Sequence, residues 1–259
     1  MFEKIPSEKE AVNLPKYEHL NKGEKPIIAS IGPRENLDEP TDSIQVSRIP
    51  EPKEGAHDVD YFADQKELEK RGLKHGGAGH AYVMSPIDDK DKFSKNFINC
   101  TGIVVAGREK QTGKDISFFA HLYSPSIAFK TRKRETFLSD LHEQMEEIKK
   151  RTEEGTIDAT IFGGNYFSEN DPINKRTVMD YTKVIEILSK ELKKGLGFDP
   201  IIMTGPKTVL NGEDVYYDTA NRRMHIVRPE TGNSSTASYV AKDMETEKEK
   251  WVGANEEPI

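Results

Sequence analysis

The sequence predicts an α+β fold in which mixed β-sheets pack as a sandwich with flanking helices. Short runs that alternate apolar with polar residues, and that are rich in β-branched and aromatic side chains, predict strands in the middle of the chain. Two longer segments place apolar residues three and four positions apart, which predicts amphipathic helices. The order of these segments (strand, strand, helix, strand, helix, strand, hairpin) favours α+β.

Composition divides the 259 residues into three regions. Residues 1–80 are rich in charges and prolines, so we expect a polar arm that is partly disordered or wraps the domain. Within it, "KPIIASI" and "SIQVSRI" are expected to be short strands and "YFADQKELEKRG" a short helix. Residues 81–230 carry the regular patterns and form the expected folded domain. Residues 231–259 are polar again and form an expected tail.

The first half of the domain predicts two strands that pair as a hairpin. After a strand at "AYVMSP", the run "NCTGIVVAG" (99–107) leads into the polar stretch 108–115, which contains Gly113. The run that follows alternates strictly, so residues 116–123 are expected to form the second strand of an antiparallel pair.

The second half of the domain predicts two helices, two strands and a second hairpin. Residues 134–155 are expected to be helical and to stop at Gly155, and a second helix is expected from Pro172 to Gly195 with Asp171 as its N-cap. The remaining predicted elements are strands at "TIDATIFGG" and "PIIMTG" and a hairpin at "EDVYYDTANRRMHIVRP".

Charge and cysteine content exclude several classes of function. The net charge of −7 argues against a nucleic-acid partner, and one cysteine excludes an internal disulfide or a multi-cysteine metal site. No apolar run reaches the roughly 20 residues that a membrane-spanning helix needs. The first residues have no apolar core of a secretion signal, so we expect a cytoplasmic protein.

Cys100 and His121 are the candidate catalytic pair. Cys100 could be a small buried core residue or a thiolate nucleophile, and a nucleophile needs a nearby base. The predicted hairpin supplies one, because it places the start of the strand at residue 100 beside the end of the strand that carries His121. His121 could equally be a core or edge imidazole.

Other polar residues carry weaker signals. Ser94, six positions before the cysteine, could orient His121 as the third member of a triad, although a serine in "DKFSKNF" is also typical of a turn or cap. His75 and His80 flank a glycine loop but lack a third metal ligand in the sequence pattern, so no metal site is predicted. The basic stretch 130–135 is expected to be a solvated helix entry, with binding to an acidic partner as the alternative.

Three ordered motifs in the domain resemble one known family. They are the long hairpin segment "NCTGIVVAGREKQTGKDISFFAHLYSP", the strand end "DATIFGGNYF", and the closing hairpin "VYYDTANRRMHIV" after the helix from residue 172. Over roughly residues 81–229 the chain resembles the chemoreceptor glutamine deamidases, the CheD family, and their wider relatives such as the catalytic domain of cytotoxic necrotizing factor.

The resemblance implies a CheD-like fold and a role for each candidate residue. Cys100 matches the family's nucleophile and His121 its base, while Ser94 falls where the family has a threonine that steadies the histidine. Residues beside the pair depart from the family pattern, which usually has Gly-Ser where this chain has Ile98 and Asn99. The substrate-facing loops are therefore expected to differ.

The implied activity is a cysteine-dependent amidohydrolase that deamidates glutamine side chains of a protein partner, without a metal or cofactor. A role related to chemotaxis is associated with the family. Two alternatives stay open: a non-catalytic binding or regulatory module on the same fold, and a cysteine hydrolase that acts on small amides.

Overall fold

The computed structural model describes residues 17–34, 52–77, 79–97, 100–163, 172–203, 213–229 and 256–258. Within these residues the chain forms two six-stranded mixed sheets and four helices, which confirms the predicted α+β class. We call the two sheets the outer sheet and the central sheet.

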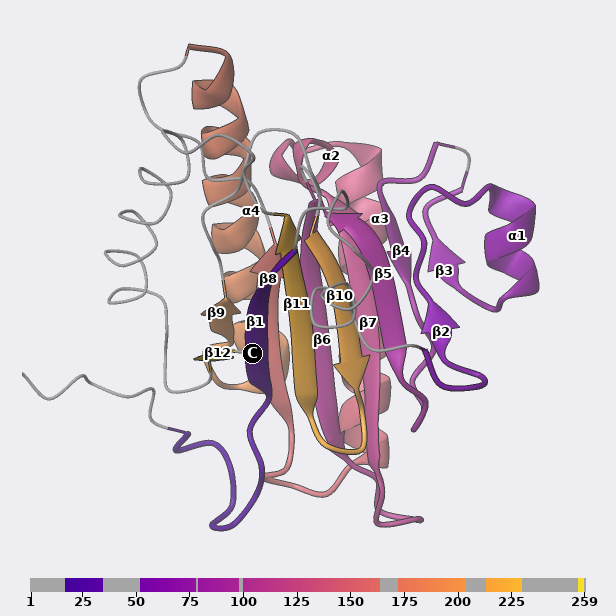
Figure 1. Cartoon of the computed structure of the whole chain (residues 1–259), viewed down its shortest axis with the longest axis vertical. Helices are drawn as coiled ribbons and strands as arrows, with labels where there is room; N and C mark the ends of the chain where they lie inside the picture. Colours follow the sequence, from indigo (N-terminus) through magenta and orange to yellow (C-terminus); the bar gives the residue numbers. More distant parts are fainter. Residues whose placement is uncertain are drawn as a thin grey trace, which may run out of the picture.

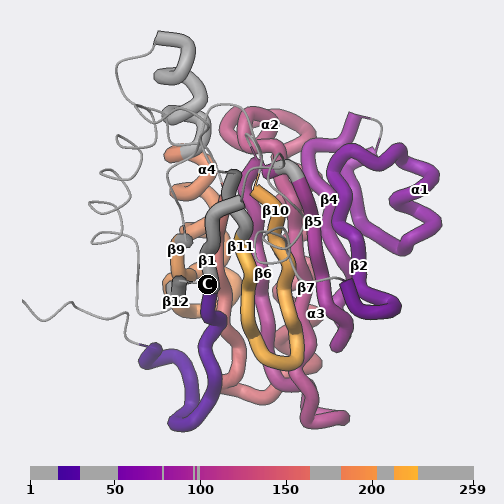
Figure 2. The backbone as a smooth tube through the Cα atoms, viewed as in Figure 1, coloured from indigo at the N-terminus to yellow at the C-terminus, as the bar shows by residue number. Residues whose placement is uncertain are grey.

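The outer sheet combines strands from both ends of the chain with strands from its middle. Its order is β12 (Glu256–Pro258), β1 (Ile28–Arg34), β11 (Arg223–Pro229), β10 (Glu213–Asp218), β5 (Lys92–Phe97) and β2 (His57–Asp58). β10 and β11 are antiparallel, which confirms the predicted second hairpin, and Figure 2 shows them as neighbouring orange strands joined by one turn. β1 pairs parallel with β11.

The central sheet is built around the predicted first hairpin. Its order is β3 (Lys74–His75), β4 (Tyr82–Met84), β7 (Asp115–Tyr123), β6 (Cys100–Arg108), β8 (Asp158–Gly163) and β9 (Ile201–Met203). β6 and β7 pair antiparallel along their whole length, from Cys100 opposite Tyr123 to Arg108 opposite Asp115. Gly113 has a φ of 69° in the turn between them, a conformation that suits glycine.

Four helices complete the described part of the chain: α1 (Gln65–Lys70), α2 (Ser124–Ala128), α3 (Arg132–Arg151) and α4 (Pro172–Leu196). The Thr131 hydroxyl caps α3 by accepting a hydrogen bond from the Arg134 N–H at 3.2 Å. α3 ends before the predicted Gly155, because Thr152 is extended and bridges to Glu109 in the β6–β7 turn. The sequence prediction missed α2 and β5.

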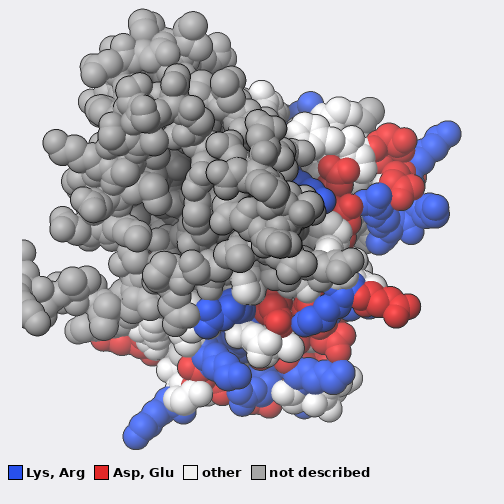
Figure 3. Space-filling view, viewed as in Figure 1, with Lys and Arg blue, Asp and Glu red and all other residues white. Residues whose placement is uncertain are grey.

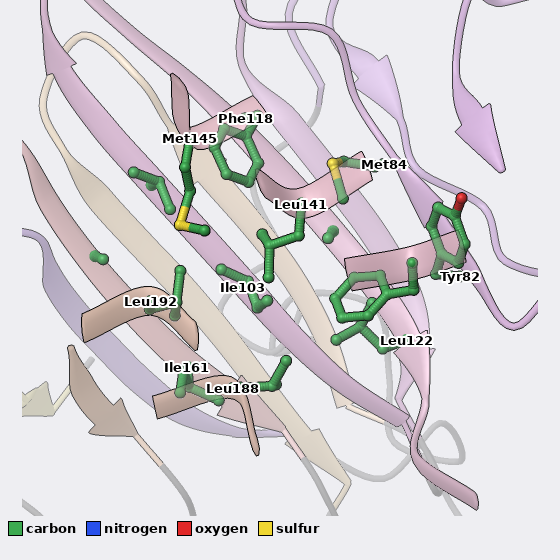
Figure 4. Close-up of a cluster of buried hydrophobic side chains, with 14 of the residues drawn as sticks. Tyr82, Met84, Ile103, Phe118, Leu122, Leu141, Met145, Ile161, Leu188 and Leu192 are labelled. Atoms are coloured by element: carbon green, nitrogen blue, oxygen red, sulfur yellow. The ribbon is translucent and has the colours of Figure 1, made fainter. Parts of the chain in front are cut away.

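Two apolar cores separate three layers. One core lies between the central sheet and helices α2, α3 and α4, and the second lies between the two sheets. Side chains that alternate along β7 contribute to both cores, because Phe118 and Ala120 face the helices while Phe119 faces the outer sheet. Figure 1 shows β10 and β11 in front of β6 and β7, and Figure 4 shows the helix-side core.

The N-terminal region contributes directly to both sheets. The predicted strand at "KPIIASI" corresponds to β1 and the predicted helix to α1, whereas the strand predicted at "SIQVSRI" lies outside the described residues. β1, β2, α1 and β3 all precede residue 81, where the domain was expected to begin. The tail predicted from residue 231 is described only over β12.

A buried charged cluster fixes the β2 edge of the outer sheet. The fully buried Lys92 donates to the Asp88 carboxylate at 2.9 Å, and His57 Nε2 lies 2.6 Å from the same group. Burial alone would raise the pKa of Asp88, but the hydrogen bonds from His57 and Lys92 outweigh it and lower this pKa to about 2. Burial also lowers the pKa of Lys92, to about 8.

Candidate active site

The candidate residues come from three strands that meet at one end of the inter-sheet core. Cys100 is the first residue of β6 and His121 lies near the end of β7, both in the central sheet, while Ser94 lies in β5 of the outer sheet. All three are buried, with His121 0% and Cys100 3% exposed. The structure therefore brings Ser94 and His121 together across the two sheets.

The ladder register puts Cys100 and His121 on the same face of the central sheet. His121 pairs with Gly102, and Cys100, two positions earlier on β6, pairs with Tyr123. Such diagonal neighbours are separated by about 7–8 Å along the sheet, a span that an imidazole and a thiol can bridge. The hairpin predicted from the sequence therefore yields the expected neighbourhood.

Ser94 determines which nitrogen of His121 carries a proton. Its hydroxyl donates to the Val59 carbonyl at 2.6 Å, and Ser94 Oγ lies 2.8 Å from His121 Nδ1. A serine hydroxyl has one proton, and a carbonyl only accepts, so the proton between Ser94 and His121 belongs to Nδ1. The neutral imidazole then keeps its lone pair on Nε2, which is the form that a general base requires.

Two aromatic rings hold the His121 ring in place. Phe97 stacks on it with ring centroids 3.8 Å apart and an interplanar angle of 13°. Tyr61 lies 5.3 Å from it, centroid to centroid, and also 6.1 Å from Tyr123. Side-chain rotation of His121 is therefore restricted by packing as well as by the bond to Ser94.

Gly102 and Gly163 lack side chains where neighbouring atoms leave no room for a Cβ. A Cβ added to Gly102 would lie 2.1 Å from the Phe162 ring, which therefore fills the space beside Cys100. Gly163 has a φ of 75°, and a Cβ there would lie 2.9 Å from the Cys100 carbonyl oxygen. These contacts explain why the strand "DATIFG" ends in glycine next to Cys100, whereas Gly164 and Asn165 lie outside the described residues.

Tyr61 covers the pair. Its hydroxyl donates to the His80 carbonyl at 3.1 Å, while His80 Nε2 lies 2.6 Å from the Tyr61 carbonyl. Burial, together with the nearby Cys100 and Tyr123, raises the pKa of Tyr61 to about 12, so the phenol is neutral at physiological pH. We expect the Tyr61 ring, which packs against His121, to restrict access to the buried Cys100.

His75, His80 and His142 are not part of the Cys100–His121 pair. His75 and His80 have ring centroids 6.1 Å apart, and among the described residues no group of three His, Cys, Asp or Glu side chains is placed to hold a metal ion. His142, on α3, contacts Glu191 of α4 at 2.8 Å.

None of the helices in the described ranges is long and apolar enough to cross a membrane.

The interpretation of Ser94 as a turn or cap residue was wrong. Ser94 is a fully buried residue inside β5, which pairs with β10 from a distant part of the chain. Phe97 and Tyr61 were also missed. The alternation in "KFSKNF" was the available signal for β5 and for Phe97, whereas no local pattern connects Tyr61 to His121.

No family model matches the chain, and no curated protein matches it.

Proposed function

We propose that this chain is a cysteine-dependent amidohydrolase that deamidates glutamine side chains of a protein partner. The observation that carries the proposal is the ordered set Val59 carbonyl, Ser94 hydroxyl and His121 Nδ1, which leaves Nε2 basic on the sheet face that holds Cys100. A catalytic histidine needs both a fixed tautomer and a fixed ring.

The reaction proceeds through a thioester. His121 Nε2 takes the proton of the Cys100 thiol, and the thiolate attacks the carboxamide carbon of the glutamine. Backbone N–H groups at the start of β6, that of Cys100 foremost, stabilise the oxyanion of the tetrahedral intermediate. The imidazolium returns its proton to the amide nitrogen, which leaves as ammonia.

Hydrolysis reverses these roles. His121 takes a proton from water, the resulting hydroxide attacks the thioester carbonyl, and the Cys100 sulfur leaves and is reprotonated. One water is consumed, and the products are a glutamate side chain and ammonia. Ser94 accepts from Nδ1 throughout and thereby favours the imidazolium that forms in both halves of the reaction.

One observation favours a second candidate, a non-catalytic binding module. Cys100 is 3% exposed, so its side chain is buried in this conformation. A module that never opened would keep the fold and bind partners through its surface. A hydrolase of small amides would need a smaller opening than one that admits a protein side chain.

Alkylation of Cys100 with iodoacetamide across pH separates these candidates. The hydrolase is expected to react faster than free cysteine below pH 8, and His121→Ala is expected to remove that advantage. Equal rates for wild type, variant and free cysteine would exclude the catalytic pair. Ammonia release from glutamine-containing proteins, compared with release from free glutamine and abolished by Cys100→Ala, then distinguishes a protein deamidase from a hydrolase of small amides.

A further inference from the structure

A group of cations lies around the end of α2 and the start of α3. Its members are Lys130, Arg132 and Lys133, which are exposed, the half-buried Arg134, and the exposed Lys183 of α4, which lies over Phe129. Among the described residues none of these five forms an ion pair, although salt bridges engage many other lysines and arginines of the chain. On the face in Figure 3, by contrast, Lys and Arg are interspersed with Asp and Glu. Other described lysines, Lys66 and Lys190 among them, form no ion pair with a described residue either. This group is distinguished by its concentration of cations, four of them within residues 130–134, in a chain of net charge −7.

Stability does not account for these charges. Arg132, Lys133 and Arg134 occupy the first turn of α3, where the positive end of the helix dipole disfavours cations. The last turn of α3, where cations are favourable, already holds three others. Neither the dipole nor an ion pair within the described residues favours the first-turn cations, so their charge is available to an external anionic partner.

Hydrogen bonds and ring contacts connect this charged group to the candidate active site. Lys133 Nζ donates a hydrogen bond to the carbonyl of Gly79. The backbone carbonyl of the next residue, His80, accepts a hydrogen bond from the Tyr61 hydroxyl. Tyr61 in turn lies against His121. On the other side, α2 begins at Ser124, three residues after His121, and the cations follow at its end.

Exposed aromatic side chains accompany the cations. The large hydrophobic residues that are exposed among the described residues are Phe62 (63%), Phe129 (41%) and Tyr123 (36%). Phe62 contacts Tyr61 edge-on at 5.4 Å, and Tyr123 lies 6.1 Å from Tyr61. The ring of Phe129 lies 5.2 Å below Lys183 Nζ. All three aromatic residues therefore adjoin either the cover of the site or the cationic group.

We propose that these five cations and three aromatic residues form a basic-aromatic rim that docks an acidic segment of the protein substrate. The inference rests on the proposed function, because the rim would present a glutamine of that segment to Cys100. Aromatic side chains are typical anchors of protein interfaces, and complementary charge accelerates encounter and selects partners. Nucleic acid and anionic membrane are competing polyanions, and the experiment below includes them.

Binding is measured with the full chain carrying Cys100→Ser, so that turnover does not interfere. The probes are three fluorescein-labelled peptides that share one central glutamine and one leucine and differ only in flanks of glutamate, serine or lysine. We expect the glutamate peptide to bind at least tenfold more tightly than the serine peptide, with affinity that falls as salt rises. The lysine peptide is expected to show no binding.

Charge-reversal variants localise the interaction. Lys130→Glu with Arg132→Glu is expected to weaken binding of the glutamate peptide at least tenfold. The matched control is Lys150→Glu with Lys194→Glu, which changes the net charge equally. Lys150 lies in the last turn of α3, and Lys194 lies beside Gly195, where α4 packs on Met145 of α3. That contact is about 20 Å along α3 from its first turn. The control is expected to leave binding within twofold.

The outcomes separate the rim from the proposed function. Equal binding of the three peptides, or equal effects of the two double variants, would overturn the rim. Tighter binding of a 20-nucleotide single-stranded RNA or of vesicles with 30% phosphatidylserine than of the glutamate peptide would overturn it as well. If wild type releases ammonia equally from all three peptides, the rim fails and the hydrolase stands; if the glutamate peptide binds selectively but releases no ammonia, the hydrolase fails and the rim stands.

Discussion

Replacing Ser94 by alanine tests the relay that fixes His121. The substitution removes one hydrogen bond to the Val59 carbonyl and one from His121 Nδ1, both in a fully buried setting. A buried hydrogen bond contributes about 1 kcal/mol net, and a buried polar group that loses its partner costs about 1–3 kcal/mol. We therefore expect a loss of about 2–3 kcal/mol in the free energy of unfolding, measured by urea denaturation.

The catalytic effect is separable from the loss of stability. Without an acceptor at Nδ1 the imidazole populates both tautomers and rotates more freely, so we expect ammonia release to fall about 10- to 100-fold. Ser94→Thr keeps the hydroxyl and should recover most of the activity. Nitrogen-15 chemical shifts of the His121 ring report the tautomer directly and should show Nδ1 protonated in wild type.

A matched variant controls for stability. Ser117→Ala removes a buried hydroxyl from β7 itself, where Ser117 Oγ lies 2.9 Å from Thr219 Oγ1, away from His121. It should destabilise the protein to a similar degree and leave ammonia release from the folded protein within twofold. If Ser94→Ala and Ser117→Ala reduce activity equally, or if the His121 tautomer is unchanged in Ser94→Ala, the relay has no catalytic role.

Three further predictions follow from the geometry. Tyr61→Ala should raise the alkylation rate of Cys100 with iodoacetamide about tenfold by opening the buried site, whereas Phe62→Ala, on the exposed neighbour, should not; equal rates for the two would show that Tyr61 is not the cover. Gly102→Ala should destabilise the fold by about 1–3 kcal/mol through its clash with the neighbouring phenyl ring, and unchanged urea stability would contradict that packing. The pKa of Asp88, about 2 in the folded chain against 3.8 for the free group, means that its stabilisation is complete above pH 4 and is lost as the pH falls towards 2. The free energy of unfolding of wild type should thus fall between pH 5 and pH 2 by about 2 kcal/mol more than that of Asp88→Asn; parallel pH profiles would rule this out.

Local pattern predicted the parts of the site that lie within one hairpin. The alternation in residues 116–123 and the glycine turn before them fix the β6–β7 pairing, and that pairing alone relates His121 to Cys100. The sequence also predicted much of the helix-side core, because apolar residues repeat every three or four positions on a helix and every two positions on a strand face. No long-range information was needed for these elements.

The sequence pattern did not predict the contacts between the two sheets. Ser94 reaches His121 because β5 joins the outer sheet by pairing with β10, more than a hundred residues later, and there faces β7 of the central sheet. Tyr61 lies in a region that composition assigned to a polar arm, yet its ring packs on His121. Both contacts depend on how two sheets stack, which no short segment encodes.

The most direct test of the central claim is to trap the thioester. The chain is mixed with a glutamine-containing protein or peptide, quenched in acid after short times, and measured by intact-mass spectrometry. The account predicts a transient adduct on Cys100 with the mass of the substrate less one ammonia, absent in Cys100→Ala, which also forms no glutamate product. Formation of glutamate at the wild-type rate by Cys100→Ala, or product from wild type without any adduct on Cys100 under these conditions, would contradict it.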